Sequence, residues 1–386
     1  MKALVLGAGL MGRVVAKDLV ESPEFSEVTL GDVDEKLLKY CENWIGSAKL
    51  KTKTIDASDE SDLKKEMEDM DIAAIALPNR FSLGAVKAAI KTGTHAVDLV
   101  GVQPEKRLAL DDEAKKAGVL VIPGLGVAPG LTNVLVGHAV ESMDKAESAV
   151  FKVGGLPVHP EPPLDYKVVF CFSSVIEACK RKVLIIKDGK LTEVEPLSGV
   201  ETITLPEPLG ECECFYTDGL STLPLSLEDS GIQFVAEKTI RYPGWCDKLG
   251  LLREIGLLDD EPVDFNGCSV SPARFLTKLL DPKITLEEGE PDLTILQIDV
   301  VGEKDGRKTC VTYEMLDFFD EKKGITSMGK TTSFPCSSAC RMIARGDLAL
   351  RGVVPPEKTF TEEQLATLLE DLKERGVVVK KKEKAL

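Results

Sequence analysis

Short apolar runs alternate with amphipathic helical segments through about the first 125 residues of the chain. Each run is short enough for one buried strand, and the segments between the runs have helical periodicity. A chain that alternates strands and helices in this way forms a parallel sheet with helices on its faces. The pattern therefore predicts the α/β class with a doubly wound parallel sheet. The runs are Lys2–Leu6, Val28–Leu30, Thr52–Ile55, Asp71–Leu77, His95–Val100 and Val119–Pro123.

From about residue 145 the pattern changes, and apolar positions alternate with polar ones at a period of two. This period is typical of antiparallel strands, and Asp-Gly pairs at 188–189 and 305–306 indicate turns between them. We therefore expect an α+β domain with an antiparallel sheet. The runs with this period are Ala149–Val153, Val183–Ile186, Gln233–Ile240 and Thr294–Val301.

Helical periodicity returns near the end of the chain, over Thr332–Ile343 and Thr361–Arg375. We expect this last part to pack on the first domain again. The predicted organisation is a first domain over 1–125, an inserted α+β domain over 126–330 and a returning segment over 331–386.

The segment Ala117–Val140 has no Asp, Glu, Lys or Arg and is long enough to span a bilayer. Prolines and glycines interrupt it between Pro123 and Gly130. We interpret the segment as a buried strand, a loop and a helix that begins at Thr132-Asn133. No membrane association is predicted from it.

The first strand leads directly into Gly7-Ala8-Gly9-Leu10-Met11-Gly12 and then into a helical pattern. In a GxGxxG loop the first glycine forms the turn, the second lets the backbone approach a pyrophosphate, and the third lets the helix pack on the strand. The helix N-terminus then faces the phosphates. The next strand ends at Asp32, about twenty residues after Gly12, where a ribose-binding acid is expected. These features predict a Rossmann domain; the alternative is a glycine turn in the same fold that binds no nucleotide.

The carboxylate of Asp32 favours NAD over NADP, because it would repel a 2′-phosphate and no Arg follows it directly. The turn Pro78-Asn79 ends a strand at the carboxyl edge of the sheet, where ligands of such sheets bind. Leu77 and Pro78 are therefore expected to line the nicotinamide side. The predicted cofactor-binding residues are Gly7, Gly9, Leu10, Met11, Gly12, Asp32, Asp56, Ala57, Leu77, Pro78 and Asn79.

The formal net charge of −16 argues against nucleic acid or an anionic membrane as a partner, because both need a basic surface. The basic segment Lys380–Lys384 is predicted to be a solvated tail. The first strand begins at residue 2 without a basic leader or a small-residue cleavage site, so we expect a cytoplasmic protein.

The ten cysteines have irregular spacing and form no CxxC pair. A four-ligand zinc site would need a second pair of ligands at a matching spacing, and the chain has only three histidines. We predict free thiols and no metal site.

Four residues are candidates for the chemistry of a substrate. Tyr166 ends a proline-rich segment that is interpreted either as a shaped loop at a site or as a rigid connection. Arg241 ends a strand and is suited to binding a substrate carboxylate, although a surface ion pair is the alternative. Asp98 ends a strand of the first domain, and Asp218 precedes a glycine. Either acid could accept a proton from a substrate ammonium group, although an Asp-Gly pair is more often only a turn.

Four motifs, taken in order, carry a resemblance to a known family. They are the glycine loop at 7–12, the segment Val121–Asn133, the segment Gly154-Gly155-Leu156-Pro157 and the segment Thr239–Gly244. Together they resemble the saccharopine dehydrogenase-like family, and within it most closely the lysine 6-dehydrogenases. The similarity extends from residue 1 to about residue 360.

The resemblance implies a homodimer with a split Rossmann domain and an inserted catalytic domain. It also implies oxidation of the ε-amine carbon of L-lysine by NAD, with release of ammonia and an allysine that cyclises. Arg241 would bind the substrate carboxylate. Ala128 stands where saccharopine-forming relatives commonly carry Asp, which favours the lysine branch. The chain departs from that branch at Trp245 and Cys179, where His and Tyr are usual.

Two other functions are compatible with the sequence. A saccharopine dehydrogenase or related reductase would act on a C–N bond between two amino-acid moieties, and it would need more cationic anchors than Arg241. Arg80 and Lys167 are among the few others placed for this role. A non-catalytic NAD-binding sensor is the second alternative, since fold does not imply function.

Overall fold

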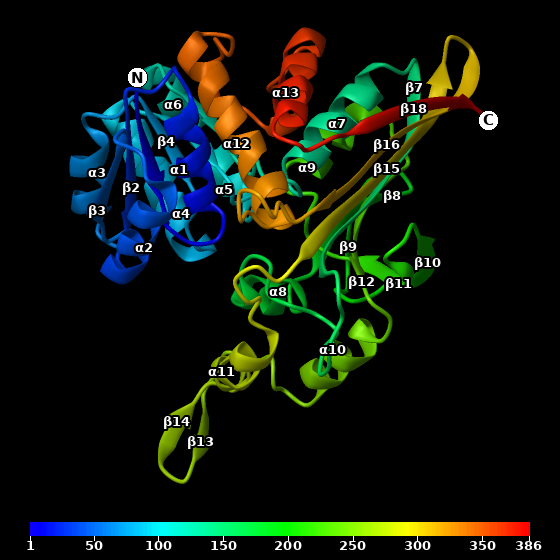
Figure 1. The fold of residues 1–386 in the computed structure, drawn as a ribbon. Helices are drawn as coiled ribbons and strands as arrows, with labels where there is room; N and C mark the ends of the chain where they lie inside the picture. Colours follow the sequence, from blue (N-terminus) through cyan, green and yellow to red (C-terminus); the bar gives the residue numbers. More distant parts are fainter. The chain divides into compact units, whose positions relative to one another are not determined.

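The computed structural model describes residues 1–386 and divides into two compact units, which we describe separately. The first unit comprises Met1–Asp144, Leu220–Leu227 and Gly329–Val379. The second unit comprises Lys145–Gly219, Glu228–Met328 and Lys380–Leu386. Figure 1 shows the helices and strands of both.

A parallel sheet of seven strands forms the centre of the first unit, in the order β17-β6-β5-β4-β1-β2-β3. Every pair in it is parallel, which confirms the doubly wound α/β fold that the apolar runs predict. The chain order reverses at β1, whose neighbours are β2 and β4, so a ligand is expected at the loop that follows β1. The strands are β1 (Lys2–Leu6), β2 (Glu27–Asp32), β3 (Leu50–Thr54), β4 (Ile72–Ile75), β5 (His95–Asp98), β6 (Leu120–Ile122) and β17 (Gly352–Val353).

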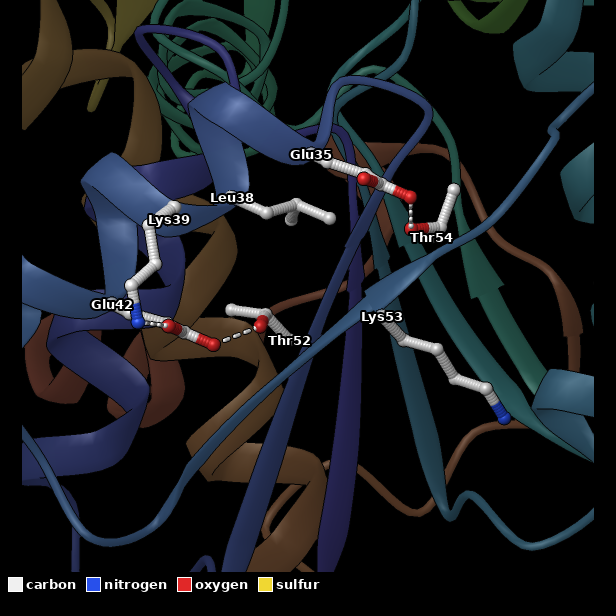
Figure 2. Close-up of a pocket in the computed structure, with 7 residues that line it drawn as sticks. All are labelled: Glu35, Leu38, Lys39, Glu42, Thr52, Lys53 and Thr54. Carbon is white, nitrogen blue, oxygen red and sulfur yellow. Dashed lines mark hydrogen bonds and ion pairs between the residues drawn. The ribbon is translucent and has the colours of Figure 1, made fainter.

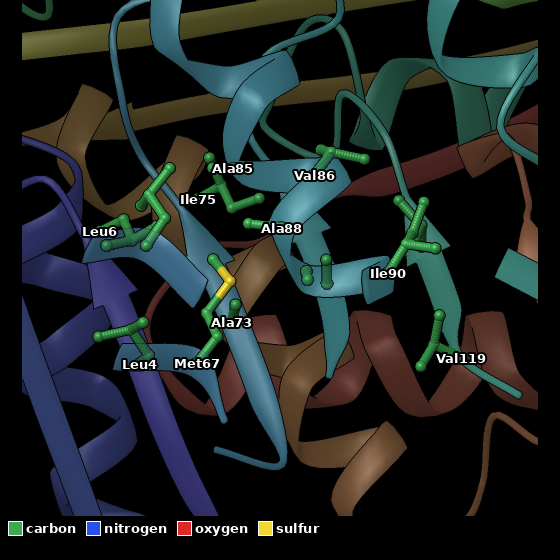
Figure 3. Packing of buried hydrophobic residues seen from close by; sticks show 14 of the residues in the cluster. Leu4, Leu6, Met67, Ala73, Ile75, Ala85, Val86, Ala88, Ile90 and Val119 are labelled. Atoms are coloured by element: carbon green, nitrogen blue, oxygen red, sulfur yellow. The ribbon is translucent and has the colours of Figure 1, made fainter. Parts of the chain in front are cut away.

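Helices cover the two faces of this sheet, and α2 lies beside the edge strand β3 (Figure 2). Leu4, Leu6 and Ile75 of the central strands pack in one apolar cluster with Val86 and Ile90 of α4 (Figure 3). Because such strands are buried on both faces, they appear in the sequence as continuous apolar runs. The helices are α1 (Gly12–Glu21), α2 (Glu35–Ile45), α3 (Glu60–Met67), α4 (Asn79–Thr92), α5 (Pro104–Leu108), α6 (Asp111–Ala117), α7 (Leu131–Glu141), α9 (Leu223–Leu227), α12 (Ser327–Arg345) and α13 (Glu362–Glu374), with a 3₁₀ turn, η2, over Pro356–Lys358.

The first unit extends beyond the predicted boundary at residue 125, because α7 packs on residues far along the chain. His138 of α7 bonds the carbonyl oxygen of Phe360 at 2.7 Å. A Cβ at Gly137 would lie 2.7 Å from the carbonyl oxygen of Glu357, so the absence of a side chain there lets η2 approach. The amide of Asn133 donates to the carbonyl oxygen of Leu220 at 2.9 Å, which holds the segment Leu220–Leu227 in this unit.

The uncharged segment Ala117–Val140 contains β6, a loop and α7. This arrangement confirms the predicted strand, loop and helix, with α7 beginning at Leu131. Among the helices, none combines the length and the apolar character needed to cross a membrane.

The second unit has a sheet of nine strands whose main path is β10-β11-β12-β7-β15-β16-β18. It is mixed rather than purely antiparallel, because β12 runs parallel to β7. The strands are β7 (Lys145–Pro157), β8 (Val183–Lys187), β9 (Lys190–Val194), β10 (Glu201–Leu205), β11 (Gly210–Tyr216), β12 (Phe234–Arg241), β15 (Asp292–Lys304), β16 (Arg307–Phe318) and β18 (Lys380–Ala385); the hairpin β13 (Val263–Phe265) and β14 (Cys268–Val270) lies outside the sheet, and the helices are α8 (Phe172–Ala178), α10 (Trp245–Glu254) and α11 (Pro272–Ile284), with a 3₁₀ turn, η1, over Glu228–Ser230.

The segment Gly154–Pro157 belongs to β7 and pairs antiparallel with β15. A Cβ at Gly155 would lie 2.1 Å from the Cε of Met328. The basic segment near the C-terminus is not a free tail but β18, which pairs antiparallel with β16. Lys382 bonds Glu314 across this pair at 2.6 Å, so acidic residues of the neighbouring strand offset its charge.

Candidate active site

The glycine loop between β1 and α1 has the geometry of a pyrophosphate site. Gly7 has a φ of +96°, and a Cβ there would lie 2.5 Å from the carbonyl oxygen of Ala76. A Cβ at Gly12 would lie 1.8 Å from the carbonyl oxygen of Gly7, whereas a Cβ at Gly9 would meet nothing within 4 Å. The first turn of α1 has no side-chain cap and no acidic residue. Its N–H groups and the open space over Gly9 therefore fit a dinucleotide.

Replacing Gly9 and Gly12 should have different consequences. Gly9→Ala should fold with an unchanged melting temperature and lose roughly tenfold or more of its affinity for NAD, because the new methyl group occupies the space over the loop. Gly12→Ala should lower stability by about 1–3 kcal/mol, because backbone must move to admit the methyl group. Thermal unfolding and a fluorescence titration with NAD measure both effects. Binding of NAD to Gly9→Ala with the affinity of the unmodified protein would contradict this assignment.

Asp32 ends β2 beside the glycine loop, as predicted. One carboxylate oxygen accepts the N–H of Ala8 at 2.7 Å, and the other accepts the N–H of Asp34 at 3.0 Å. These bonds fix the carboxylate at the edge where the ribose of a dinucleotide binds in this fold. The guanidinium of Arg13 lies 5.6 Å from the ring centres of both Tyr40 and Trp44.

The other predicted cofactor residues lie in loops or first turns that follow strands of the first unit. Leu10 and Met11 immediately precede α1, and Leu77, Pro78 and Asn79 precede or begin α4. The loop after β4 adjoins the glycine loop, because Ala76 limits the space at Gly7. Asp56 and Ala57 follow β3, and the Asp56 carboxylate accepts the N–H and the hydroxyl of Ser58 at 2.8 and 2.7 Å.

A shallow hollow of about 130 Å³ lies between α2 and β3 and contains none of these residues (Figure 2). Its polar side chains bond one another: Lys39 bonds Glu42 at 2.7 Å, and Glu42 also accepts the hydroxyl of Thr52. We assign no ligand to it.

Asp98, one of the two candidate acids, is fully buried in the first unit. Its carboxylate accepts the hydroxyl of Ser82 at 2.6 Å, the Nε of Arg107 at 3.1 Å and the N–H of Val100 at 2.9 Å. Burial raises the pKa of Asp98, and the charge of Arg107 opposes that rise. These bonds favour a structural role for this carboxylate.

Arg241, at the end of β12 in the second unit, is buried between aromatic rings. Its guanidinium lies 4.9 Å from the ring centre of Tyr166 and 5.3 Å from that of Trp245. One of its nitrogens donates to the carbonyl oxygen of Ile240 at 2.7 Å, and its Nε is buried without a partner. The chain supplies no carboxylate to this guanidinium. A buried cation with an unsatisfied donor is costly, so the arrangement fits a site for a carboxylate ligand.

The other two predicted catalytic residues lie in the same unit. Tyr166 is buried against Trp245 with ring centres 5.1 Å apart, and its hydroxyl has no partner. Burial raises the pKa of Tyr166. Asp218 forms an ion pair with Arg181 at 2.7 Å, so its charge is already compensated. The structure thus brings Tyr166 to Arg241 and gives Asp218 another partner.

Sequence reasoning missed Glu237, a buried carboxyl group on the same face of β12 as Arg241. Its side chain accepts the hydroxyl of Thr217, the hydroxyl of Thr239 at 3.3 Å and the N–H of Gly219 at 3.3 Å. Burial raises the pKa of Glu237 to about 7. The available signal was its spacing of four residues from Arg241, because residues i and i+4 of a strand share a face.

The ten cysteines are free thiols. Cys179 is buried in the apolar cluster that includes Tyr166 and Trp245, and burial raises its pKa to about 12. No group of three or more His, Cys, Asp or Glu side chains is arranged to hold a metal ion.

Two family models together match nearly the whole chain. The model described as saccharopine dehydrogenase NADP binding domain matches residues 3–122, and the one described as saccharopine dehydrogenase C-terminal domain matches residues 126–377. An L-glutamate-forming, NADP(+)-dependent saccharopine dehydrogenase from Schizosaccharomyces pombe is 24% identical, over 92% of this chain and 93% of that protein. A carboxyaminopropylagmatine dehydrogenase from Synechocystis is also 24% identical, over 95% of each chain.

Solved structures share the fold. An apo saccharopine dehydrogenase (L-Glu forming) from Saccharomyces cerevisiae matches with a TM-score of 0.81 and 22% identity, over 100% of both chains. A homospermidine synthase from Legionella pneumophila in complex with NAD matches with a TM-score of 0.67 and 13% identity, over 100% of this chain and 91% of that one. At these identities the matches establish the architecture only.

Proposed function

Because the chain belongs to the saccharopine dehydrogenase family, we propose that it is an NAD-dependent oxidoreductase that acts on a C–N bond between two amino-acid moieties. The observation that carries this proposal is Arg241, a buried cation without a carboxylate partner that lies within the residues matched by the C-terminal family model. A guanidinium in this position is suited to binding the carboxylate of an amino acid.

The names of the relatives support a substituted amine as substrate. They are dehydrogenases of saccharopine that form L-glutamate and a dehydrogenase of carboxyaminopropylagmatine. This evidence favours the C–N bond between two moieties over the primary ε-amine of lysine that the sequence motifs suggested.

Each part of the site would contribute one physical effect. The glycine loop and the N-terminus of α1 would hold the pyrophosphate, and Asp32 would accept the ribose hydroxyls. Bound NAD would accept a hydride from the carbon attached to the substrate nitrogen. Arg241 would fix the substrate carboxylate, and its guanidinium lies 4.9 Å and 5.3 Å from the ring centres of Tyr166 and Trp245.

We propose NAD rather than NADP as the cofactor, although the matching domain model and the S. pombe relative name NADP. Asp32, Asp34 and Glu35 place three acidic residues at the end of β2 and the start of α2. A 2′-phosphate at this edge would meet like charge.

L-Lysine is a second candidate substrate, and one residue favours it. Ala128 occupies the position before Pro129-Gly130 where saccharopine-forming members commonly carry Asp. Oxidation of lysine would release ammonia, whereas oxidation of saccharopine would release an amino acid.

The purified protein should therefore be mixed with NAD or NADP and with saccharopine, a carboxyalkyl polyamine, L-lysine and other amino acids. Formation of the reduced cofactor is followed by the absorbance of reduced nicotinamide at about 340 nm. Amino-acid products and ammonia are measured separately. We expect NAD reduction with a substituted amine and release of an amino acid. Ammonia release from lysine alone would move the assignment to the second candidate. Binding of NAD without turnover of any amine would refute the proposed reaction and favour a sensing role.

A further inference from the structure

Glu237 is a buried carboxyl group to which the proposed function assigns no task. Its side chain is 1% exposed, and it forms no ion pair. Every donor to its oxygens is neutral: two threonine hydroxyls and one backbone N–H. Burial of a carboxyl group without a cation is costly, and such groups concentrate at functional sites.

The donors to Glu237 lead toward Arg241 along the surface of the sheet. Thr239 lies between Glu237 and Arg241 on β12, and alternate residues of a strand share a face. The hydroxyl of Thr239 lies 2.7 Å from that of Thr217, and both hydroxyls bond Glu237. The carboxyl group and the hydroxyls therefore form one hydrogen-bonded network, which extends to within two residues of the proposed carboxylate anchor.

Other acidic groups considered for the reaction are engaged elsewhere. Asp98 bonds Arg107 in the interior of the first unit, and Asp218 bonds Arg181. Burial raises the pKa of Tyr166, so its hydroxyl holds its proton at neutral pH. Glu237 is a carboxyl group on the Arg241 face of β12 that has no cation to hold it in the charged form.

We propose that Glu237 takes up the proton that the substrate amine loses before hydride transfer, acting through the hydroxyls of Thr239 and Thr217. This inference rests on the proposed function. Because Glu237 would reach the substrate only through these hydroxyls, it is a positioning residue rather than a catalytic one.

The proposed step balances in protons and electrons. The ammonium group of the substrate gives one N–H proton to the hydroxyl of Thr239, and a hydroxyl proton of the network passes to the Glu237 carboxylate. The nitrogen lone pair would then form a C=N bond as the C–H bond breaks, and bound NAD would supply the acceptor for the hydride. Water hydrolyses the iminium product, and Glu237 returns its proton to solvent through the same hydroxyls.

Burial and one neighbouring charge raise the pKa of Glu237, and this sets the expected pH dependence of the reaction. Asp218 is the charged neighbour that acts on it, and it adds to the effect of burial. Arg181 compensates Asp218, and Arg241 lies four residues further along the strand. Because the carboxylate is the form that accepts a proton, kcat for amine oxidation should rise as the pH increases through about 7.

The test compares Glu237→Gln with Glu201→Gln, a matched change on β10 of the same sheet. Glu201 pairs with Lys238 and takes no part in the network. We expect Glu237→Gln to lower kcat by roughly 100-fold, to leave KM within about threefold and to lose the rise of kcat through about pH 7. Glu201→Gln should retain the rate and the pH profile. Glu237→Asp should recover part of the rate with a displaced profile.

Two further measurements keep the proposal testable if Glu237→Gln is poorly folded or inactive for another reason. Thr239→Val should slow kcat, whereas Thr239→Ser, which keeps the hydroxyl, should not. Thermal unfolding gives a readout without substrate or cofactor. The folded carboxyl holds its proton to about pH 7 and the unfolded one only to about 4.5, so the unmodified protein loses stability between these values. The melting temperature of Glu237→Gln minus that of the unmodified protein should therefore become larger as the pH rises from about 4.5 to about 7.

The outcomes separate this inference from the function on which it rests. Turnover by the unmodified protein together with an unchanged rate and pH profile in Glu237→Gln would overturn the role of Glu237 and leave the proposed function standing. Equal rates for Thr239→Val and Thr239→Ser would overturn it as well. Failure of the unmodified protein to oxidise any amine would refute the proposed function, and this inference with it.

Discussion

Arg241→Met should lower kcat/KM for the amine substrate roughly 100-fold or more, about 3 kcal/mol of lost transition-state stabilisation. Methionine keeps most of the apolar contact with Tyr166 and Trp245 but removes the guanidinium. Loss of a charged, desolvated partner leaves the substrate carboxylate without its anchor, so most of the change should be in KM. Steady-state kinetics with varied substrate and saturating NAD measure it.

Two controls distinguish loss of the anchor from loss of the fold. Arg253→Met makes the same change on α10, where Arg253 bonds the carbonyl oxygen of Pro196 at 3.3 Å, and should leave kcat/KM within about threefold. The affinity of Arg241→Met for NAD should be unchanged. Arg241→Lys should recover little activity, because a lysine lacks the planar fork that binds a carboxylate with two bonds. Near-normal KM in Arg241→Met would show that the carboxylate binds elsewhere.

Asp32→Asn should reduce the preference for NAD over NADP by roughly 100-fold. The unmodified protein is expected to prefer NAD, because a 2′-phosphate placed against a carboxylate costs several kcal/mol. Asparagine has nearly the same shape, and its one oxygen can accept the N–H of Ala8; its amide nitrogen cannot accept the N–H of Asp34, so one of the two bonds is lost. The ratio of kcat/KM for the two cofactors, or the ratio of their dissociation constants, measures the change.

Asp34→Asn is the matched control for this prediction. Asp34 caps α2 by accepting the N–H groups of Lys36 and Leu37, and asparagine caps helices about as well. Removal of its charge should alter the cofactor ratio by less than about tenfold, because Asp32 is the residue proposed to contact the ribose. A preference of the unmodified protein for NADP would contradict the assignment of Asp32 and agree with the cofactor named for the S. pombe relative.

Local patterns in the sequence predicted much of the first unit. The apolar runs correspond to strands of one parallel sheet, and the glycine loop precedes α1 as expected. Such features depend on residues within a few positions of one another, and a buried parallel strand needs only a continuous apolar run. The second unit was predicted less completely. The parallel pairing of β12 with β7 joins segments about ninety residues apart, and a period of two does not specify the direction of a partner strand.

Charge compensation among distant residues changed the interpretation of the candidate acids. Asp98 pairs with Arg107 and Asp218 pairs with Arg181, so the charges of both are compensated. Glu237 is buried without an ion pair, and its spacing from Arg241 was the signal for it in the sequence. The basic segment that became β18 is also compensated from a distance, since its acidic partner Glu314 lies on another strand.

The sequence by itself determined the parallel sheet of the first unit, the glycine loop, the acid that ends β2 at position 32 and the arginine that ends β12. Each of these features depends on the spacing of residues that lie close together in the sequence, because the geometry of a strand or a turn fixes where such residues lie. Only the tertiary structure decided which charged groups are compensated, which segments return to the first unit and which carboxyl groups are buried without a cation. Those properties depend on contacts between residues far apart in the chain. The free energy of a charged group depends on how far these contacts remove it from water and on which partners they supply.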